Sequence, residues 1–140
     1  MTTLKPSHFC LFVGDQDAAL AFYTEKLGME KRMDVPFGDM RWLTVGSPDQ
    51  PDLELVLIDA GVRPDITDDV NDLMARGGMN GLIFQTNDCR AAYAELSAKG
   101  VEFTGEPEEQ FYGIDVGFRD PFGNMFRLTQ PAENMVLPTA

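Results

Sequence analysis

Arg127 raises the clearest chemical question in this sequence. It lies in the segment FRDPFGNMFRLTQ, which reads as the end of one strand, a turn and a second strand. Alternation along that second strand puts Met125, Arg127 and Thr129 on one face. A guanidinium carries N–H donors, stays protonated at physiological pH and has no lone pair, so it can bind an anion or a carbonyl oxygen but cannot ligate a metal. Arg127 therefore either faces a pocket or points out to solvent.

The only histidine, His8, is the second candidate. An imidazole titrates near neutral pH and suits a general base or a metal ligand. His8 leads the strand-like run HFCLFV, and the sequence identifies no acid that would act with it. A functional residue facing a pocket and a satisfied histidine at the end of a strand explain it equally well.

The two cysteines, Cys10 and Cys89, lie far apart and form neither a CxxC motif nor a Cys/His cluster. Cys10 lies in an apolar run and Cys89 at the start of a predicted helix, so we expect buried or semi-buried free thiols. A helix N-terminus can lower the pKa of a thiol, which leaves the reactivity of Cys89 open.

The elements that must position these residues occur in a repeated order. Helical spacing of apolar residues, period-two strands and punctuating glycines predict a strand, a helix and three strands, twice over. The first copy consists of HFCLFVGD, QDAALAFYTEKLG, MEKRMDVP, MRWLTVG and DLELVLI. The second consists of NGLIFQTND, CRAAYAELSAKG, VEFTGEP, QFYGIDVGF and NMFRLTQ.

The two copies also align residue by residue. Gly28 and Gly100 differ by 72 positions (100 − 28), and Leu55 and Leu128 in the fourth strands differ by 73 (128 − 55). A single copy leaves one face of its sheet uncovered, so two copies are expected to share a core. We predict one α+β domain divided into modules 1–59 and 79–131, a connector 60–78 with a short helix near DDVNDLMARG, and a C-terminal tail 132–140.

Composition limits the classes of partner. The net charge is −12 and the acidic residues are spread over both halves, with no basic patch. Phosphate backbones and anionic membranes would be repelled, so we expect no nucleic-acid or membrane partner. No apolar run approaches the roughly 20 residues that span a bilayer, and the N-terminus lacks the layout of a signal peptide. We therefore expect a cytoplasmic protein.

The third strand of each copy offers further pocket candidates. Trp42, Phe111 and Tyr112 could stack on a flat organic ligand. Gly113 and Gly117 alternate along their strand and leave room for a ligand or another backbone to approach. Packing in the core or at a dimer contact explains the same aromatic residues. The charged run EPEE reads as a solvated loop.

The duplicated order, the segment VGDQDAALAFYTEKLG and the segment DPFGNMFRLTQ together resemble the vicinal oxygen chelate superfamily, which includes glyoxalases, bleomycin-resistance proteins and extradiol dioxygenases. The resemblance extends from about Pro6 to Gln130. It implies two tandem βαβββ modules that form a U-shaped, eight-stranded mixed sheet around a pocket, commonly in a homodimer.

The DPFGN turn itself needs no chemical role. Asp120 can cap the turn, Pro121 presets φ, and Gly123 or Asn124 tolerates the left-handed conformation that reverses the chain.

Catalytic members of the superfamily hold a divalent metal with side chains from the first and fourth strands of each module. The resemblance carries these four positions onto His8, Glu54, Asn80 and Arg127. His8 and Glu54 suit a metal, whereas Asn80 offers only a neutral oxygen, and the alignment could slip to Gly81. Arg127 argues against a metal, so we expect no metal cofactor, although the divalent ion of the superfamily stays open. Our hypothesis is that the guanidinium takes the place of the metal, pairs with Glu54 and offers its other donors to an anionic or carbonyl group of a ligand.

Two classes of function follow from the resemblance. The first is metal-independent binding of a small aromatic or antibiotic-like molecule, and we favour it. The second is an enzyme: a lyase or isomerase of the glyoxalase kind, or a dioxygenase, with an atypical metal site, or a metal-free enzyme that uses His8 and Arg127. The predicted ligand pocket consists of His8, Trp42, Glu54, Asn80, Tyr112 and Arg127.

Overall fold

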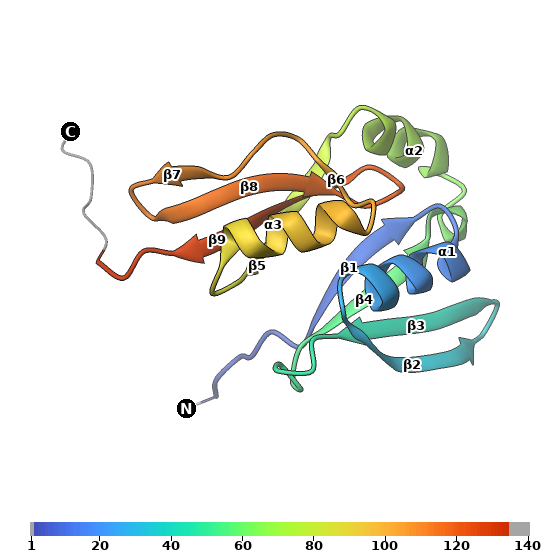
Figure 1. Ribbon diagram of the computed structural model, residues 1–140. Helices are drawn as coiled ribbons and strands as arrows, with labels where there is room; N and C mark the ends of the chain where they lie inside the picture. The colour runs from blue at the N-terminus through green and yellow to red at the C-terminus, as the bar shows by residue number, and fades with distance from the viewer. Residues whose placement is uncertain (1, 135–140) are drawn as a thin grey trace. The chain divides into compact units, whose positions relative to one another are not determined.

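The computed structural model describes residues 2–134, so most of the predicted tail lies outside the described residues. The chain divides into two compact units, Met1–Leu73 and Met74–Ala140. Both carry the predicted order of elements (Figure 1). Among the described residues, no helix is long and apolar enough to cross a membrane.

The first unit is a four-stranded mixed sheet with one helical segment on it. The strand order is β1-β4-β3-β2, and β1 runs parallel to β4 while the other neighbours are antiparallel. Its elements are β1 (His8–Val13), α1 (Gln16–Ala21) with a π-helical turn (Phe22–Lys26), β2 (Glu30–Phe37), β3 (Met40–Gly46) and β4 (Glu54–Asp59).

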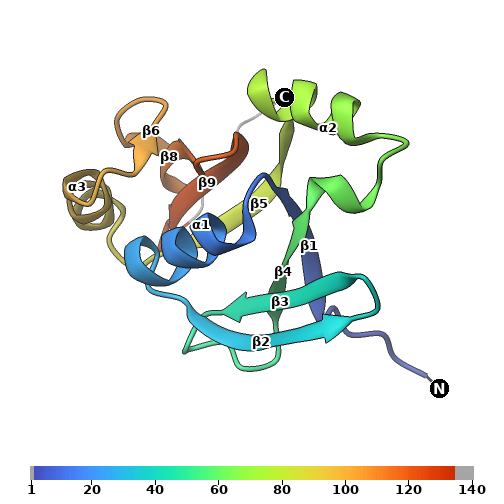
Figure 2. The ribbon, with the colours of Figure 1, turned by 90° about the vertical axis from the view of Figure 1, so that its right-hand side faces the viewer.

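Helix α1 starts and stops where the sequence predicts. The Asp15 carboxylate caps the helix by accepting from the Ala18 backbone N–H at 2.8 Å, and Gly28 ends the helical segment with φ of 74°. Tyr23 and Ala19 are fully buried. They pack with the apolar residues of one sheet face, and Figure 2 shows α1 running along that face.

The second unit has a five-stranded sheet. The strand order is β5-β9-β8-β6, β7 also pairs with β8, and β5 runs parallel to β9. Its elements are β5 (Met79–Gln85), α3 (Cys89–Ala98), β6 (Glu102–Phe103), β7 (Glu108–Gln110), β8 (Gly113–Arg119) and β9 (Asn124–Pro131). The connector holds a 3-10 turn (Ala60–Val62) and the predicted helix, α2 (Thr67–Ala75).

An aromatic cluster forms the core of the second sheet. Phe118 is almost fully buried, with its ring centroid 5.3 Å from that of Phe126 and 5.6 Å from that of Phe84. Phe103 of β6 and Tyr93 of α3 extend the cluster, and their ring centroids lie 4.7 Å apart. The Tyr93–Phe103 pair is edge-to-face, a geometry that is favourable beyond the apolar area that it buries. Helix α3 contacts β8 and β9.

The DPFGN turn is built as predicted. Asp120 is buried, and its Oδ1 accepts from the backbone N–H groups of Phe122 and Asn124, both at 2.9 Å. Its Oδ2 accepts from the Asn124 side-chain amide at 2.8 Å. Gly123 adopts φ of 101°, a conformation that L side chains avoid. The turn fixes where β9 starts, and so where Arg127 lies.

The α+β class and the tandem βαβββ order are confirmed, and two details differ. Residues 2–134 form nine strands because Glu108–Gln110 forms β7, where the sequence indicated only a solvated loop. Charged, exposed residues are tolerated on such a short edge strand. Cys10 is exposed, because strand alternation puts it on the face opposite α1, whereas Cys89 is buried as expected. The union of the two sheets into one U-shaped sheet stays a prediction.

Candidate functional site

In the second unit, Arg127 is paired with a carboxylate that the sequence analysis did not single out. Its Nη2 donates to Asp115 Oδ1. The two residues lie on neighbouring antiparallel strands, where Asp115 is opposite Thr129 and Gly117 is opposite Arg127. The pair thus joins a cation on β9 to an anion one pleat away on β8.

Asp115 is held firmly in this arrangement. Its side chain is only 4% exposed, while that of Arg127 is 51% exposed. Asp115 Oδ2 also accepts from the Thr129 hydroxyl at 3.0 Å, and the Tyr112 hydroxyl donates to the same carboxylate. Burial raises the pKa of Asp115, but the hydrogen bonds and charge of Arg127, together with Thr129, outweigh burial and hold that pKa below its ordinary value. Asp115 is therefore a fixed anion at neutral pH.

The same cluster perturbs the tyrosine. Desolvation raises the pKa of Tyr112, and the neighbouring charge of Asp115 raises it further. The Tyr112 hydroxyl consequently stays protonated and acts as a hydrogen-bond donor. Its ring packs edge-on against Phe111, whose side chain is exposed.

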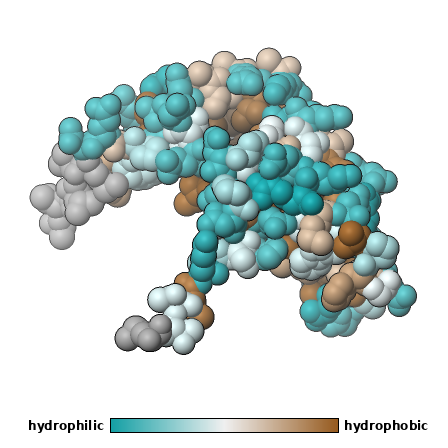
Figure 3. Space-filling view, turned by 90° about the horizontal axis from the view of Figure 1, so that it is seen from below, coloured by the Kyte–Doolittle hydropathy of each residue, from teal (hydrophilic) through white to brown (hydrophobic). Residues whose placement is uncertain are grey.

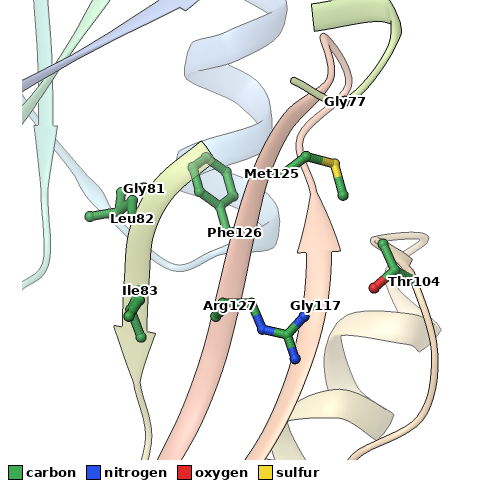
Figure 4. Close-up of a pocket in the computed structure, with 9 residues that line it drawn as sticks. All are labelled: Gly77, Gly81, Leu82, Ile83, Thr104, Gly117, Met125, Phe126 and Arg127. Atoms are coloured by element: carbon green, nitrogen blue, oxygen red, sulfur yellow. The ribbon is translucent and has the colours of Figure 1, made fainter. Parts of the chain in front are cut away.

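A glycine makes room for the guanidinium. A Cβ at Gly117 would lie 2.7 Å from Arg127 Nη1 and 2.5 Å from Thr104 Oγ1, so any larger residue would displace these groups. Figure 4 shows the Arg127 side chain crossing from β9 toward Gly117 on β8. The sequence predicted that a ligand or another backbone would approach the alternating glycines of this strand. At Gly117 the group that approaches is the Arg127 side chain of the neighbouring strand.

Beside this cluster is a cavity of about 430 Å³, formed entirely within the second unit. Arg127 and the Thr104 hydroxyl supply its polar groups, and most of the remaining wall is apolar (Figure 4). The larger side chains that line it are Leu82, Ile83, Thr104, Met125, Phe126 and Arg127. Ile83 is 64% exposed, which is unusual for a residue of its type.

In the first unit, the sheet face opposite α1 carries a row of aromatic rings. The Trp42 ring centroid lies 6.1 Å from that of His8 and 6.1 Å from that of Phe37. Strand register puts Val35 and Met33 of β2 on the same face, and both are exposed together with Phe37. Apolar side chains that are exposed together in this way are typical of a surface that binds a ligand or another protein.

His8 and Glu54 lie opposite each other in the register of β1 and β4. Glu54 Oε1 accepts from the buried Thr44 hydroxyl at 2.5 Å, and Glu54 Oε2 lies 3.9 Å from His8 Nε2. The other ring nitrogen of His8 is 2.8 Å from Ser7 Oγ. Glu54 is thus the acid next to His8 that the sequence could not identify.

Asn80, the third position that the resemblance implies, does not lie opposite Arg127 in the register of β5 and β9. Asn80 is opposite Met125, the register then shifts at Gly81, and the β5 residue opposite Arg127 is Ile83. Gly81 has φ of 131°, which marks a bulge. The pairing of Arg127 with Glu54, which lie in different units, stays a prediction.

These residues do not fit the metal site that the resemblance implies. His8 and Glu54 could each supply a ligand, but Arg127 has no lone pair, and Ile83 is the residue opposite it. Among the described residues, no three His, Cys, Asp or Glu side chains come together as a metal site would require. We therefore derive no chemical step through a metal.

Comparisons with known proteins identify relatives over most of the chain. The model of the Glyoxalase/Bleomycin resistance protein/Dioxygenase superfamily matches residues 5–128. The uncharacterized protein YurT of Bacillus subtilis (strain 168) is 38% identical over 120 residues, which are 86% of this chain and 94% of YurT.

Two solved structures are similar along nearly their whole length. The crystal structure of UcmS2 has a TM-score of 0.87 and 40% sequence identity, over 92% of this chain and 99% of UcmS2. The crystal structure of TnmS3, an antibiotic binding protein from Streptomyces sp. CB03234, has a TM-score of 0.78 and 32% identity, over 94% of this chain and 99% of TnmS3.

Proposed function

Because the chain belongs to the glyoxalase/bleomycin resistance protein/dioxygenase superfamily, we propose that it binds a small aromatic or antibiotic-like molecule without a metal. The observation that carries this proposal is the Arg127–Asp115 pair at the cavity. A guanidinium fixed at a position that in catalytic relatives would supply a metal ligand repels a metal ion but recognises a polar group of an organic ligand.

The cavity suits a ligand of this class. Its volume of about 430 Å³ lies within the roughly 300–1,000 Å³ of small-molecule sites, which combine apolar walls with a few polar groups. Met125 and Ile83 offer apolar contact, and Arg127 and Thr104 offer hydrogen bonds.

The aromatic row of His8, Trp42 and Phe37 supports the same proposal. Its rings come from β1, β3 and β2 of one sheet and would stack on a planar ligand. TnmS3, a similar protein by sequence and fold, is described as an antibiotic binding protein, which favours an antibiotic-like ligand for this chain too.

The proposal includes a homodimer located in the cytoplasm. Within their own units, β1 and β5 are edge strands that pair with a single neighbour, and edges of this kind are commonly covered by association. Sedimentation would give about twice the 15.5 kDa of one chain, whereas a single species of that mass would contradict the dimer.

A thermal-shift screen of aromatic and antibiotic compounds on chelator-treated protein tests the binding proposal. Trp42 is the only tryptophan, so a compound that stacks on the aromatic row should also quench its fluorescence. Phe37 is 66% exposed, so Phe37→Ser should weaken this binding while leaving the melting temperature of the free protein almost unchanged. A broad library without any stabilising compound would count against the proposal.

One observation favours a second candidate function. His8 lies next to Glu54, which Thr44 holds in place, and such a pair could act as a general base in a lyase or isomerase reaction of the glyoxalase kind. Turnover of a hemithioacetal by chelator-treated protein, abolished in His8→Ala, would support this enzyme. Turnover lost on chelation would instead support a metal-dependent one.

A further inference from the structure

We infer that the polar group recognised by Arg127 is an uncharged hydrogen-bond acceptor, such as a ketone, lactone or amide carbonyl, and not a carboxylate or phosphate. The inference rests on the proposed function and names the chemical class of ligand that this cavity selects.

The first argument is that the charge of Arg127 is already compensated. Asp115 contacts Arg127 Nη2 directly, so this cation and this anion cancel at the cavity wall. An anionic ligand would meet a nearly neutral pair instead of an isolated cation, and it would gain little Coulomb energy for the cost of losing its hydration.

The second argument is that the compensating anion cannot leave. The Asp115 side chain is 4% exposed and is held by the Thr129 hydroxyl at 3.0 Å and by Tyr112. A ligand carboxylate that drew Arg127 away would leave Asp115 buried without its cation, which is strongly unfavourable. The ligand must therefore bind to Arg127 while the pair stays intact.

The third argument is that the intact pair still has donors to offer. Asp115 engages Nη2, which leaves the N–H groups of Nε and Nη1 for a ligand within the second unit. The Arg127 side chain is 51% exposed and lines the cavity, so these donors are accessible. A carbonyl oxygen accepts such hydrogen bonds without bringing a charge.

The electrostatic field of the whole protein also disfavours an anionic ligand. The net charge is −12, and hydrophilic residues cover most of the face shown in Figure 3. An anion would approach against this field, whereas a neutral ligand would not be affected by it.

Three matched probes separate the alternatives: 2-acetylnaphthalene, 2-naphthoate and 2-ethylnaphthalene. They share one aromatic skeleton and carry a neutral acceptor, an anion and no acceptor, respectively. Their dissociation constants and binding sites follow from titrations of the ¹⁵N-labelled full chain monitored by NMR, which detects weak binding. We expect the ketone to bind about tenfold more tightly than either of the other two, as one hydrogen bond to a charged donor allows.

Variants test the role assigned to each charge. Arg127→Met should lower the affinity for the ketone to that for the hydrocarbon, whereas Arg90→Met, which removes an exposed cation of α3, should leave it unchanged. Asp115→Asn keeps the shape of the side chain but frees the charge of Arg127, so it should raise the affinity for 2-naphthoate. In the wild type, the affinity for the ketone should not change between low and high salt, a readout that requires no variant to fold.

Each remaining outcome has a definite meaning. Tightest binding of 2-naphthoate to the wild type, weakened by salt, would overturn the inference but leave the proposed function standing. Equal binding of all three probes would also overturn it, because the Arg127 donors would then contribute nothing. No binding of any probe at the cavity would count against the proposed function itself.

Discussion

Gly117→Ala tests the arrangement around Arg127 without removing any of its charged groups. The new Cβ would lie 2.7 Å from Arg127 Nη1 and 2.5 Å from Thr104 Oγ1, closer than Cβ atoms come to such groups. The guanidinium is at the end of a flexible side chain, so the fold should survive while it moves away from Asp115. We expect the protein to lose stability because the ion pair between Arg127 and Asp115 is broken.

The size of that loss can be bounded. Breaking a fully buried ion pair costs about 3–5 kcal/mol, whereas a fully exposed pair contributes about 0–1 kcal/mol. Asp115 is 4% exposed and Arg127 is 51% exposed, so solvent screens one partner and not the other. We therefore expect the free energy of unfolding to fall by about 1–3 kcal/mol.

The matched control is Gly105→Ala. Replacing glycine by alanine stabilises a protein by about 0.4–1 kcal/mol through the entropy of the unfolded chain, and this effect is common to both variants. A Cβ at Gly105 would meet no atom within 4 Å, and the backbone of neither glycine is in the left-handed region. The difference between the variants, measured by urea unfolding at pH 7, gives the cost of displacing Arg127 and Thr104. Equal stability of the two variants would refute the arrangement described here.

Three further predictions concern single residues. Because the pKa of Asp115 in the folded protein lies below its ordinary value of about 3.9, its stabilising effect is complete above that pH and is lost as pH falls through the folded-state pKa. The stability difference between wild type and Asp115→Asn should thus narrow below about pH 4, and a constant difference would contradict the pairing. Cys10 is exposed, whereas Cys89 is buried and its pKa is raised by desolvation, so iodoacetamide should label one thiol in the native protein and both after denaturation. Labelling of both in the native protein would show that Cys89 is accessible. Asp120→Ala should lower the free energy of unfolding by about 2–4 kcal/mol in urea, since a buried carboxylate that organises a turn is lost; a change below about 0.5 kcal/mol would contradict that role.

Local chemistry made the turn and the helix starts predictable from the sequence. The cap by Asp120 and the left-handed Gly123 depend only on residues within the turn, as does the cap of α1 by Asp15. Alternation likewise placed Met125 and Arg127 on one face of β9, and both line the cavity. These features require no knowledge of distant contacts.

The pairings across strands were harder to predict. Asn80 is opposite Met125, and the one-residue register shift at Gly81 then puts Ile83 instead of Leu82 opposite Arg127; a bulge of this kind is set by the neighbouring strand. Asp115 did leave a signal, because it alternates with Gly117 along an otherwise apolar strand. Asp115 can be identified as the partner of Arg127 only once β8 and β9 are known to be adjacent.

Metal-independent binding is tested most directly by the dissociation constant of a screened compound that quenches Trp42 fluorescence, measured with chelator and then with added Ni, Zn, Mn or Fe. Metal-independent binding predicts the same constant under all these conditions, and elemental analysis of the purified protein should find no stoichiometric metal. Binding that occurs only when a metal is added would contradict the account and would indicate a metal-dependent site.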